Sequence, residues 1–315
     1  MQRPRTTEQA QSAPPLFAVP IILVMVAVTV LFSGCQGLFF YPSAEHYWDP
    51  ADAGLVYQDV FFEAPDGTRL HGWFLPARTE EPLGSVFFVH GNAQNVSTHV
   101  TAVWWLPREG FNVFMFDYRG FGRSQGRPTF DGVHLDTEAA METATTMADI
   151  DPERLIVFGQ SLGASVAITT VARRKDMIMP AGLIAESPFA SYRGITREKL
   201  AGFWPTWALQ HPLSWLISDE YAPVDSIAEL SPIPLLLIVA EDDRTIPPHH
   251  GELLFEAAGE PRHLWRIEGA RHNQPLADPD VRRRFVETMR GWLGGDLDAA
   301  SLPPAGPWQP QPPQP

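Results

Sequence analysis

The chain has 315 residues, 44% of them hydrophobic, so it can fold around a sizeable core as one large domain with appendages or as two small domains. Its formal net charge of −14 disfavours a polyanionic partner, and it carries no basic stripe and no RNA-binding aromatic motif. Its single cysteine and its histidines do not stand at metal-ligand spacing. We therefore expect neither a nucleic-acid partner nor a metal site.

The beginning of the chain resembles a secretory signal. Arg3 and Arg5 precede an apolar run over residues 16–32, and small residues then lead to Cys35. This only cysteine stands where a bacterial lipoprotein signal has its acylated cysteine. Two alternatives remain open. One is an uncleaved membrane anchor, because the apolar run nearly reaches spanning length, and the other is a signal peptide followed by an incidental cysteine.

On the first interpretation, residues 1–34 are a signal peptide and residues 35–55 are a lipid-anchored tether, held at a membrane through acylated Cys35. The protein is then an exported, membrane-anchored lipoprotein of a bacterial cell envelope. Residues 56–295 form the folded domain. Residues 296–315 hold many proline and glutamine residues with little else apolar, which predicts a Pro-rich disordered tail.

The folded part opens with an antiparallel hairpin, because residues 57–62 and 70–75 alternate in polarity around a turn that contains Asp66-Gly67. A short apolar run at residues 85–90 is typical of a buried parallel strand. Further strands are expected at residues 112–117, 155–158, 182–185, 234–240 and 263–267, with helices at residues 96–108, 133–149, 248–258 and 278–292. This alternation predicts an α/β fold with a mostly parallel central sheet flanked by helices.

Residues 189–230 interrupt this alternation. They are rich in tryptophan, proline and other apolar residues, which predicts a small helical cap over a site at the carboxyl ends of the strands. The alternative is that these aromatic side chains are only a packing layer, because aromatic residues are core formers first.

A sharp strand-to-helix turn at residues 159–163, which read GQSLG, is the strongest signal in the chain. An apolar strand precedes it and a run of small apolar residues follows it directly. This is the pattern of a nucleophile elbow, in which Ser161 adopts a strained backbone conformation with its hydroxyl exposed. Gly159 and Gly163 would let the strand and the helix approach each other closely.

A second stretch, residues 122–126, matches the same Gly-x-Ser-x-Gly pattern around Ser124. Ser124 lies beyond the expected end of its strand, and the Gly-Arg-Pro sequence that follows it cannot open a helix there. The context therefore favours Ser161 over Ser124 as the nucleophile.

A nucleophilic serine needs a base, and the base needs a third group to fix its tautomer. His272 is the best-placed histidine, because it lies in a loop just past a late strand. Asp243 follows the preceding strand and is the favoured acid, with adjacent Asp242 and the earlier Glu186 as alternatives. The order Ser161, Asp243, His272 is the serine, acid, histidine order of one known hydrolase fold.

An oxyanion hole needs two preorganised N–H donors where negative charge develops. One would be the backbone N–H of Leu162, directly after the nucleophile. The other would come from the loop after the early buried strand, most simply from Asn92, with Ala93 next. An ordinary strand-end turn is the alternative interpretation of that loop.

Six motifs taken together resemble the α/β-hydrolase superfamily over roughly residues 56–293. They lie at residues 90–93, 117–124, 159–163, 186–189, 243–247 and 269–273. They are similar to a branch of small serine hydrolases with a short cap, which includes depalmitoylating thioesterases and many bacterial relatives. The resemblance implies the α/β-hydrolase fold and a mainly structural role for residues 117–124.

The motifs predict a serine hydrolase that cleaves carboxylic esters or thioesters of small acyl substrates through Ser161, His272 and Asp243, without a cofactor. The apolar residues of the predicted cap favour an acyl or lipid-like substrate. A peptidase or a lipase of the same fold stays open, as does a hydrolase-fold lipoprotein that has lost activity and serves as a binding or scaffold module. Haloalkane and epoxide hydrolysis are disfavoured, because enzymes of those types commonly place an aspartate where Ser161 stands.

Overall fold

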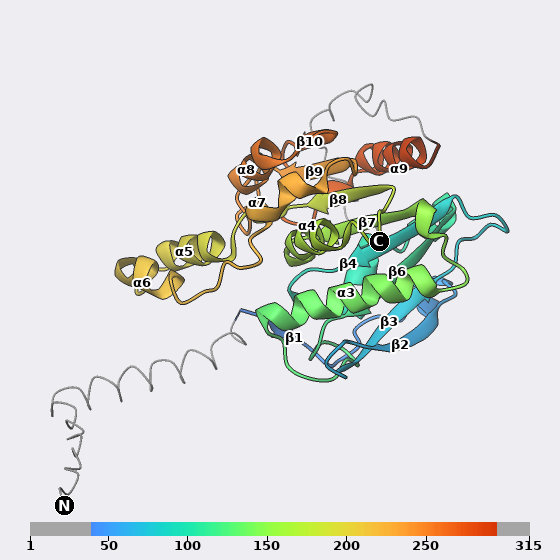
Figure 1. Cartoon of the computed structure of the whole chain (residues 1–315), viewed down its shortest axis with the longest axis horizontal. Helices are drawn as coiled ribbons and strands as arrows, with labels where there is room; N and C mark the ends of the chain where they lie inside the picture. The colour runs from blue at the N-terminus through green and yellow to red at the C-terminus, as the bar shows by residue number, and fades with distance from the viewer. Residues whose placement is uncertain (1–38, 295–315) are drawn as a thin grey trace, which may run out of the picture.

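The computed structural model describes residues 39–294, and an eight-stranded sheet runs through it (Figure 1). The strand order is β10-β9-β8-β7-β4-β6-β3-β2. β2 (Gln58–Glu63) pairs antiparallel with β3 (Arg69–Leu75), β3 pairs antiparallel with β6 (Phe111–Asp117), and all other neighbouring pairs are parallel. The predicted signal segment, Cys35 and the Pro-rich tail lie outside the described residues.

The remaining strands of the sheet form its buried centre and one edge. They are β4 (Gly84–Val89), β7 (Leu155–Gln160), β8 (Gly182–Glu186), β9 (Leu235–Ala240) and, at the edge, β10 (Arg262–Ile267). Every residue of β4, β7, β8 and β9 is buried. Near-continuous apolar runs of this kind are typical of parallel strands that are covered on both faces, so the predicted parallel α/β sheet is confirmed.

Helices cover both faces of the sheet, and each face has its own hydrophobic core. Apolar side chains of α3 (Phe130–Thr146), α4 (Leu162–Arg174) and α8 (His249–Ala257) join the core on one face. The core of the other face includes side chains of α9 (Pro279–Gly294) and of the turns that follow β4. No helix within residues 39–294 is both long and apolar enough to cross a bilayer.

The helix predicted over residues 96–108 is wrong beyond its first turn. α2 spans only Val96–His99, and two 3₁₀ turns follow at Val100–Ala102 and Leu106–Glu109. Asn95 caps α2 by accepting a hydrogen bond from the Ser97 amide at 2.9 Å. The stretch is rich in β-branched and indole side chains, which lose rotamer freedom in a helix, and a proline lies inside the last turn.

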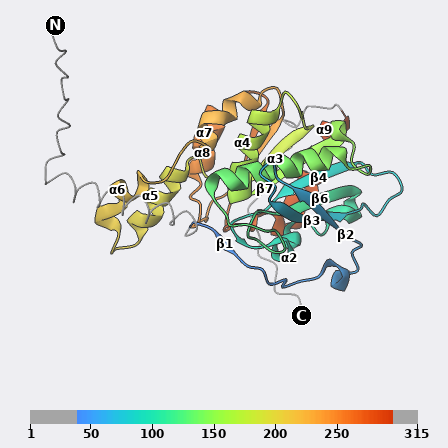
Figure 2. The ribbon, with the colours of Figure 1, turned by 60° about the horizontal axis from the view of Figure 1, so that its bottom comes forward.

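Residues 192–217 form a helical hairpin that projects from one side of the molecule (Figures 1 and 2). We call it the α5–α6 excursion. It consists of α5 (Tyr192–Gly202), a 3₁₀ turn at Trp207–Leu209 and α6 (Gln210–Ser214). The chain then returns through α7 (Pro223–Ser226) to the core, where Ile227 is fully buried.

The first described residues are tied to the loop after β4. β1 (Tyr41–Pro42) pairs in parallel with β5 (Ala93–Gln94), and the amide of Tyr41 donates to the Asn92 carbonyl at 3.3 Å. The Asn92 side chain in turn donates from Nδ2 to the Phe39 carbonyl at 2.5 Å. The N-terminal segment therefore supports the loop that was predicted to supply an oxyanion donor.

Candidate active site

Ser161 lies at the turn between β7 and α4, with a φ of 57° and a ψ of −120°. This is a backbone conformation that side-chain-bearing residues rarely adopt. The approach of strand and helix requires glycine on both sides. A Cβ at Gly159 would lie 2.5 Å from the Ala164 Cα, and one at Gly163 would lie 2.0 Å from the Val89 carbonyl oxygen. The strain predicted at the elbow is therefore present, but Ser161 is only 7% exposed, so the predicted exposure of its hydroxyl is not found.

A chain of hydrogen bonds joins the three residues that were predicted to act together. The Ser161 Oγ lies 3.0 Å from the His272 Nε2, and the His272 Nδ1 lies 2.7 Å from the Asp243 Oδ2. Because a carboxylate only accepts, the Nδ1 carries the proton of the neutral ring. The lone pair on Nε2 therefore faces the serine hydroxyl, which is the tautomer that a general base needs.

Asp243 is held in place by more than the histidine. Its Oδ1 accepts hydrogen bonds from the amides of Thr245 at 2.7 Å and Ile246 at 2.8 Å. Burial alone would raise the pKa of the Asp243 carboxyl, but its bond to His272 and these two amides outweigh burial and lower that pKa. Adjacent Asp242 is exposed, so the structure brings Asp243 and not Asp242 to the histidine.

Glu186, the other alternative acid, does not contact His272. Its Oε2 accepts a hydrogen bond from the Gln160 Nε2 at 3.0 Å, and its buried Oε1 has no partner within the described residues. Burial is the largest effect on this carboxyl and raises its pKa to about 7. Its main chain does contribute to the site, because the Glu186 carbonyl accepts from the Ser161 amide at 2.8 Å.

Two backbone amides are available next to Ser161. Leu162 is the first residue of α4, and its N–H donates to no acceptor within residues 39–294. The same holds for the N–H of Asn92 within that part of the chain. The loop that carries Asn92 lies against the serine, because a Cβ at Gly91 would be 3.5 Å from the Ser161 Cβ. Ala93 instead pairs with Tyr41 in the β1–β5 ladder.

A buried carboxylate behind this loop was missed as part of the site. Asp117, at the end of β6, accepts a hydrogen bond from the Val96 amide at 2.8 Å and lies 3.5 Å from the His90 Nε2. Tyr118 donates from its hydroxyl to the His90 carbonyl at 2.8 Å. Burial alone would raise the pKa of Asp117, but His71, His90 and the Val96 amide lower it. These contacts fix both ends of the Asn92 loop.

Ser124, in the second Gly-x-Ser-x-Gly match, has a structural role. Its Oγ donates to the Asp117 carbonyl at 2.6 Å and accepts from the His71 amide at 3.0 Å. The side chain is buried, and the described residues place no histidine ring nitrogen within hydrogen-bonding distance of it. Its hydroxyl is therefore used to close the loop after β6.

Two clefts lie near the three hydrogen-bonded residues, one lined by Asp243 and His272 and the other by Gln160 and Asn273, and Ser161 lines neither. The first has a volume of about 690 Å³ and is lined by polar side chains, among them those of Asp242, Arg244 and Arg271. The second, of about 650 Å³, is lined by residues that include Trp48, His99 and Gln160.

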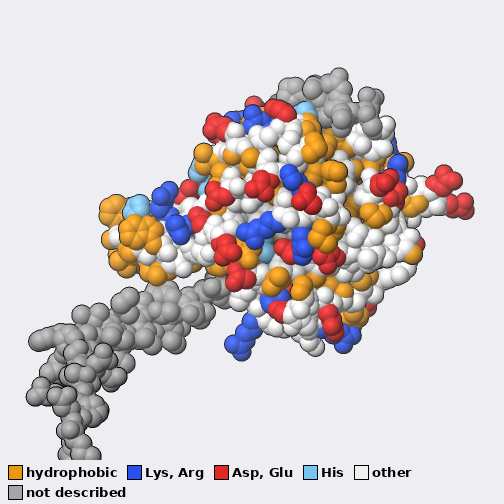
Figure 3. All heavy atoms as spheres, in the orientation of Figure 1, with side chains coloured by type: hydrophobic (Ala, Val, Ile, Leu, Met, Phe, Trp, Pro, Cys, Tyr) orange, Lys and Arg blue, Asp and Glu red, His pale blue; other side chains and the backbone are white. Residues whose placement is uncertain are grey.

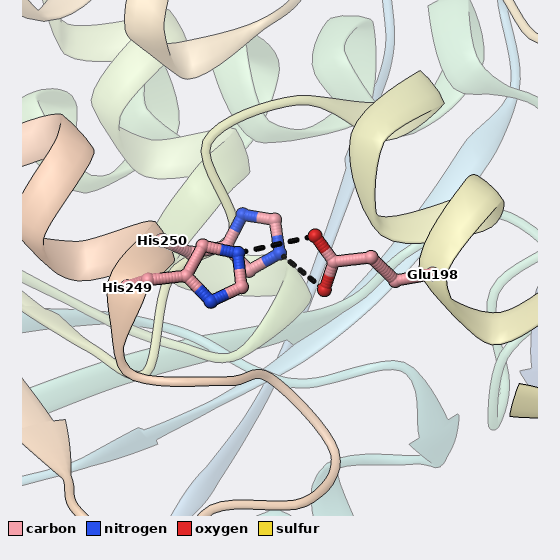
Figure 4. A group of neighbouring side chains, drawn as sticks. All are labelled: Glu198, His249 and His250. Carbon is pink, nitrogen blue, oxygen red and sulfur yellow. Dashed lines mark hydrogen bonds and ion pairs between the residues drawn. The ribbon is translucent and has the colours of Figure 1, made fainter. Parts of the chain in front are cut away.

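The group of side chains most similar to a metal site lies beside the loop that carries Asp243. It connects the α5–α6 excursion to α8 (Figure 4). The Glu198 carboxylate lies 3.1 Å from the His249 Nε2 and 3.3 Å from the His250 Nε2. The His250 Nδ1, however, accepts a hydrogen bond from the Ala190 amide at 3.2 Å. A neutral His250 ring then carries its proton on Nε2 and offers no lone pair to a metal there, so these contacts act as a tie between two helices.

Comparison with known proteins gives the family. Residues 80–229 match the family described as "Serine aminopeptidase, S33". The chain is 39% identical over 244 residues to "Uncharacterized protein YfhR" of Escherichia coli (strain K12), covering 76% of this chain and 81% of that protein. It is 29% identical to "Alpha/beta hydrolase domain-containing protein WAV2" of Arabidopsis thaliana, over 75% and 79% of the two chains. The chain belongs to the α/β-hydrolase superfamily.

Solved structures of α/β hydrolases share its fold. The Pyrococcus furiosus esterase Pf2001 superposes with a TM-score of 0.65 at 24% identity, covering 81% of this chain and 98% of that one. Membership of the α/β-hydrolase superfamily supports hydrolysis as the general class of reaction.

Proposed function

We propose that this α/β hydrolase is a serine esterase or thioesterase that uses Ser161, His272 and Asp243 as a catalytic triad. The observation that carries the proposal is the unbroken chain of hydrogen bonds from the Asp243 Oδ2 through His272 to the Ser161 Oγ. The esterase named above supports it only through the shared fold, because 24% identity carries no information on substrate.

In the first half of the proposed reaction, the Ser161 Oγ attacks the acyl carbon while the His272 Nε2 takes the hydroxyl proton. The Asp243 carboxylate stabilises the imidazolium that forms. The amides of Leu162 and Asn92 donate to the oxyanion of the tetrahedral intermediate, aided by the N-terminus of α4. When the intermediate collapses, the bond to the leaving group breaks, and His272 gives its proton to the departing alcohol or thiol.

In the second half, water attacks the acyl-enzyme and the neutral His272 takes a proton from it. The acyl–Oγ bond then breaks, and the proton returns to Ser161 as the carboxylic acid leaves. Water is the only co-reactant, so no cofactor takes part in this mechanism.

A panel of p-nitrophenyl esters and acyl thioesters of graded chain length tests this function. We expect turnover of at least one ester or thioester by the wild-type chain and none above background by the Ser161→Ala variant. A folded wild-type chain that hydrolyses no member of the panel would contradict the proposal and would favour the inactive binding or scaffold module.

A peptidase is the second candidate, because residues 80–229 match a family described as a serine aminopeptidase. The same triad can attack an amide, with His272 protonating the departing amine. Aminoacyl p-nitroanilides in the same assay distinguish the two reactions. A higher kcat/KM for the anilides than for the matched esters would favour the peptidase.

We also propose that the chain is an exported lipoprotein that is acylated at Cys35 and held at a membrane of the cell envelope. The support is the sequence alone, namely the two arginines, the apolar run and the position of the cysteine. Mass spectrometry of the N-terminus tests it. An intact Met1 together with an unmodified Cys35 thiol would contradict the proposal.

A further inference from the structure

Exposed apolar side chains gather on the α5–α6 excursion (Figure 3). Trp204 is 85% exposed, Trp215 70%, Trp207 63% and Phe203 59%. Leu209 and Leu216 on the same hairpin are also exposed. Soluble proteins rarely leave several indole rings together in water, so a gathering of this kind marks a surface that binds something apolar.

These side chains do not belong to the hydrophobic core. Within α5 the only buried residues are Tyr192 and Ile195, both in its first two turns, and within α6 only Ser214 is buried. Beyond Ile195 the two helices pack mainly on each other. The hairpin therefore places its aromatic tip away from the sheet, as Figures 1 and 2 both show.

The charge of the hairpin differs from that of the whole chain. Residues 192–217 carry three cations, Arg193, Arg197 and Lys199, against the single anion Glu198, which is a net charge of +2. The whole chain has a net charge of −14. Asp219 and Glu220 follow the hairpin closely, and Asp219 accepts hydrogen bonds from the Ser191 hydroxyl and the Arg193 amide, so the positive charge belongs to α5 and not to the base of the hairpin. Exposed tryptophans beside the cations of α5 suit the interface of a bilayer, where indole rings lie at headgroup depth and cations meet anionic lipids.

The described chain begins at the base of this hairpin. The Phe39 ring lies 5.9 Å from the Tyr192 ring and 6.4 Å from the Phe189 ring, measured between centroids. The 38 residues that precede Phe39 include the apolar run at residues 16–32. The apolar end of the sequence therefore joins the domain on the side from which the hairpin projects.

From this coincidence we infer that the α5–α6 excursion binds the surface of a lipid bilayer, with Trp204, Trp207 and Trp215 inserted at headgroup depth. The inference does not depend on hydrolytic activity. Because Glu198 ties α5 to His249 and His250 beside the Asp243 loop, the hairpin would hold the active site at a defined orientation to the membrane.

A single environment-sensitive fluorophore at the hairpin tip tests the inference. In a full-length Cys35→Ser chain, a Trp204→Cys substitution supplies the only thiol. The probe is a vesicle of phosphatidylcholine with about a third phosphatidylglycerol. We expect the label to shift to shorter wavelength, to gain about twofold in intensity and to lose most of its quenching by iodide when vesicles are added.

A Met177→Cys substitution gives the matched control. Met177 is 66% exposed, and it lies between α4 and β8, outside the α5–α6 excursion. We expect its label to stay unchanged in the same vesicles. A label at position 204 that stays accessible to iodide while the chain is bound to the vesicles would overturn the inference.

A second copy of the chain is the main rival occupant of this surface. It would shift the label at position 204 without vesicles and in proportion to protein concentration, and that result would also overturn the inference. Replacing both Trp207 and Trp215 by serine should remove most of the vesicle-dependent shift. Met177 and Met179 are exposed apolar residues outside the hairpin, and replacing both by serine should leave the vesicle-dependent shift intact.

Discussion

The two Gly-x-Ser-x-Gly loops of this chain have the same sequence pattern and different chemistry. In the loop around Ser161 the serine itself has a positive φ, and its hydroxyl faces the His272 Nε2 at 3.0 Å. In the loop around Ser124 the positive φ values fall on Gly122 and Gly126, and the serine hydroxyl is bound by the main chain on both sides. The difference is therefore in the backbone and not in the motif.

The two loops differ in the hydrogen bonds that each serine hydroxyl makes. Ser124 accepts from one amide and donates its only hydroxyl proton to a main-chain carbonyl, so no donor is left for a base. Ser161 is held by its own strained main chain and by the Glu186 carbonyl, and its hydroxyl remains free for the histidine.

The largest expected effect comes from replacing each of the two serines by alanine in a separate variant. Ser161→Ala should lower kcat by at least about ten-thousand-fold, because it removes the nucleophile and leaves only binding and the oxyanion hole. Ser124→Ala should leave kcat near the wild-type value. Rates on a short acyl ester, measured on variants that circular dichroism shows to be folded, check both. A reversed order of the two effects would refute the assignment.

A similar contrast separates the two acids at the strand ends. Asp243→Asn should lower kcat by about 10⁴-fold, because the amide stabilises the wrong tautomer of His272. Glu186→Gln should retain most of the activity, because glutamine can still accept the hydrogen bond from Gln160. The kcat of each variant on one substrate decides between them. If the Glu186 variant loses more activity than the Asp243 variant, the acid has been misassigned.

The Ser124 loop should instead respond in stability. Ser124→Ala should lower the free energy of unfolding by about 1–3 kcal/mol, because it leaves the buried His71 amide and the Asp117 carbonyl without that partner. Denaturant unfolding of the variant measures the loss. A Ser124→Thr substitution keeps the hydroxyl and serves as the control, so an equal loss in both variants would point to packing and not to the hydrogen bonds.

The stability of the chain should also depend on pH through Glu186. Its pKa of about 7 in the folded chain is above the ordinary value of 4.5, so folding favours its protonated form. Its contribution to stability is complete below pH 4.5 and is lost as the pH rises through 7. Wild type should therefore lose up to about 1.4 kcal/mol per pH unit relative to Glu186→Gln across this range. A difference in the free energy of unfolding between wild type and Glu186→Gln that stays constant from pH 4.5 to 7 would rule this out.

Much of the fold could be predicted because apolar runs and turn residues are local signals. The hairpin around Asp66-Gly67, the buried strands and the elbow all follow from stretches of a few residues, and the structure has them. The helix over residues 96–108 failed, because its apolar spacing fits a helix while its β-branched residues and Pro107 favour tight 3₁₀ turns.

The geometry that brings Ser161, Asp243 and His272 together could be predicted because each follows a parallel strand, and parallel strands end at one edge of the sheet. The contacts that hold the Asn92 loop in place could not be predicted in this way. Antiparallel pairing of β3 with β6 brings His71 to Asp117, and the N-terminal segment brings the Phe39 carbonyl to the Asn92 side chain. No local spacing in the sequence encodes either contact. The exposure of the tryptophans likewise depends on how the α5–α6 excursion leaves the core.

Peptide mapping after reaction with a fluorophosphonate tests the central claim most directly, because this reagent phosphonylates a serine that a base has activated, with loss of fluoride. We predict a single phosphonyl adduct on Ser161 in the wild-type chain. The Asp243→Asn variant should label far more slowly, and Ser161→Ala should not label. An adduct on Ser124, or a folded wild-type chain without any adduct, would contradict the account.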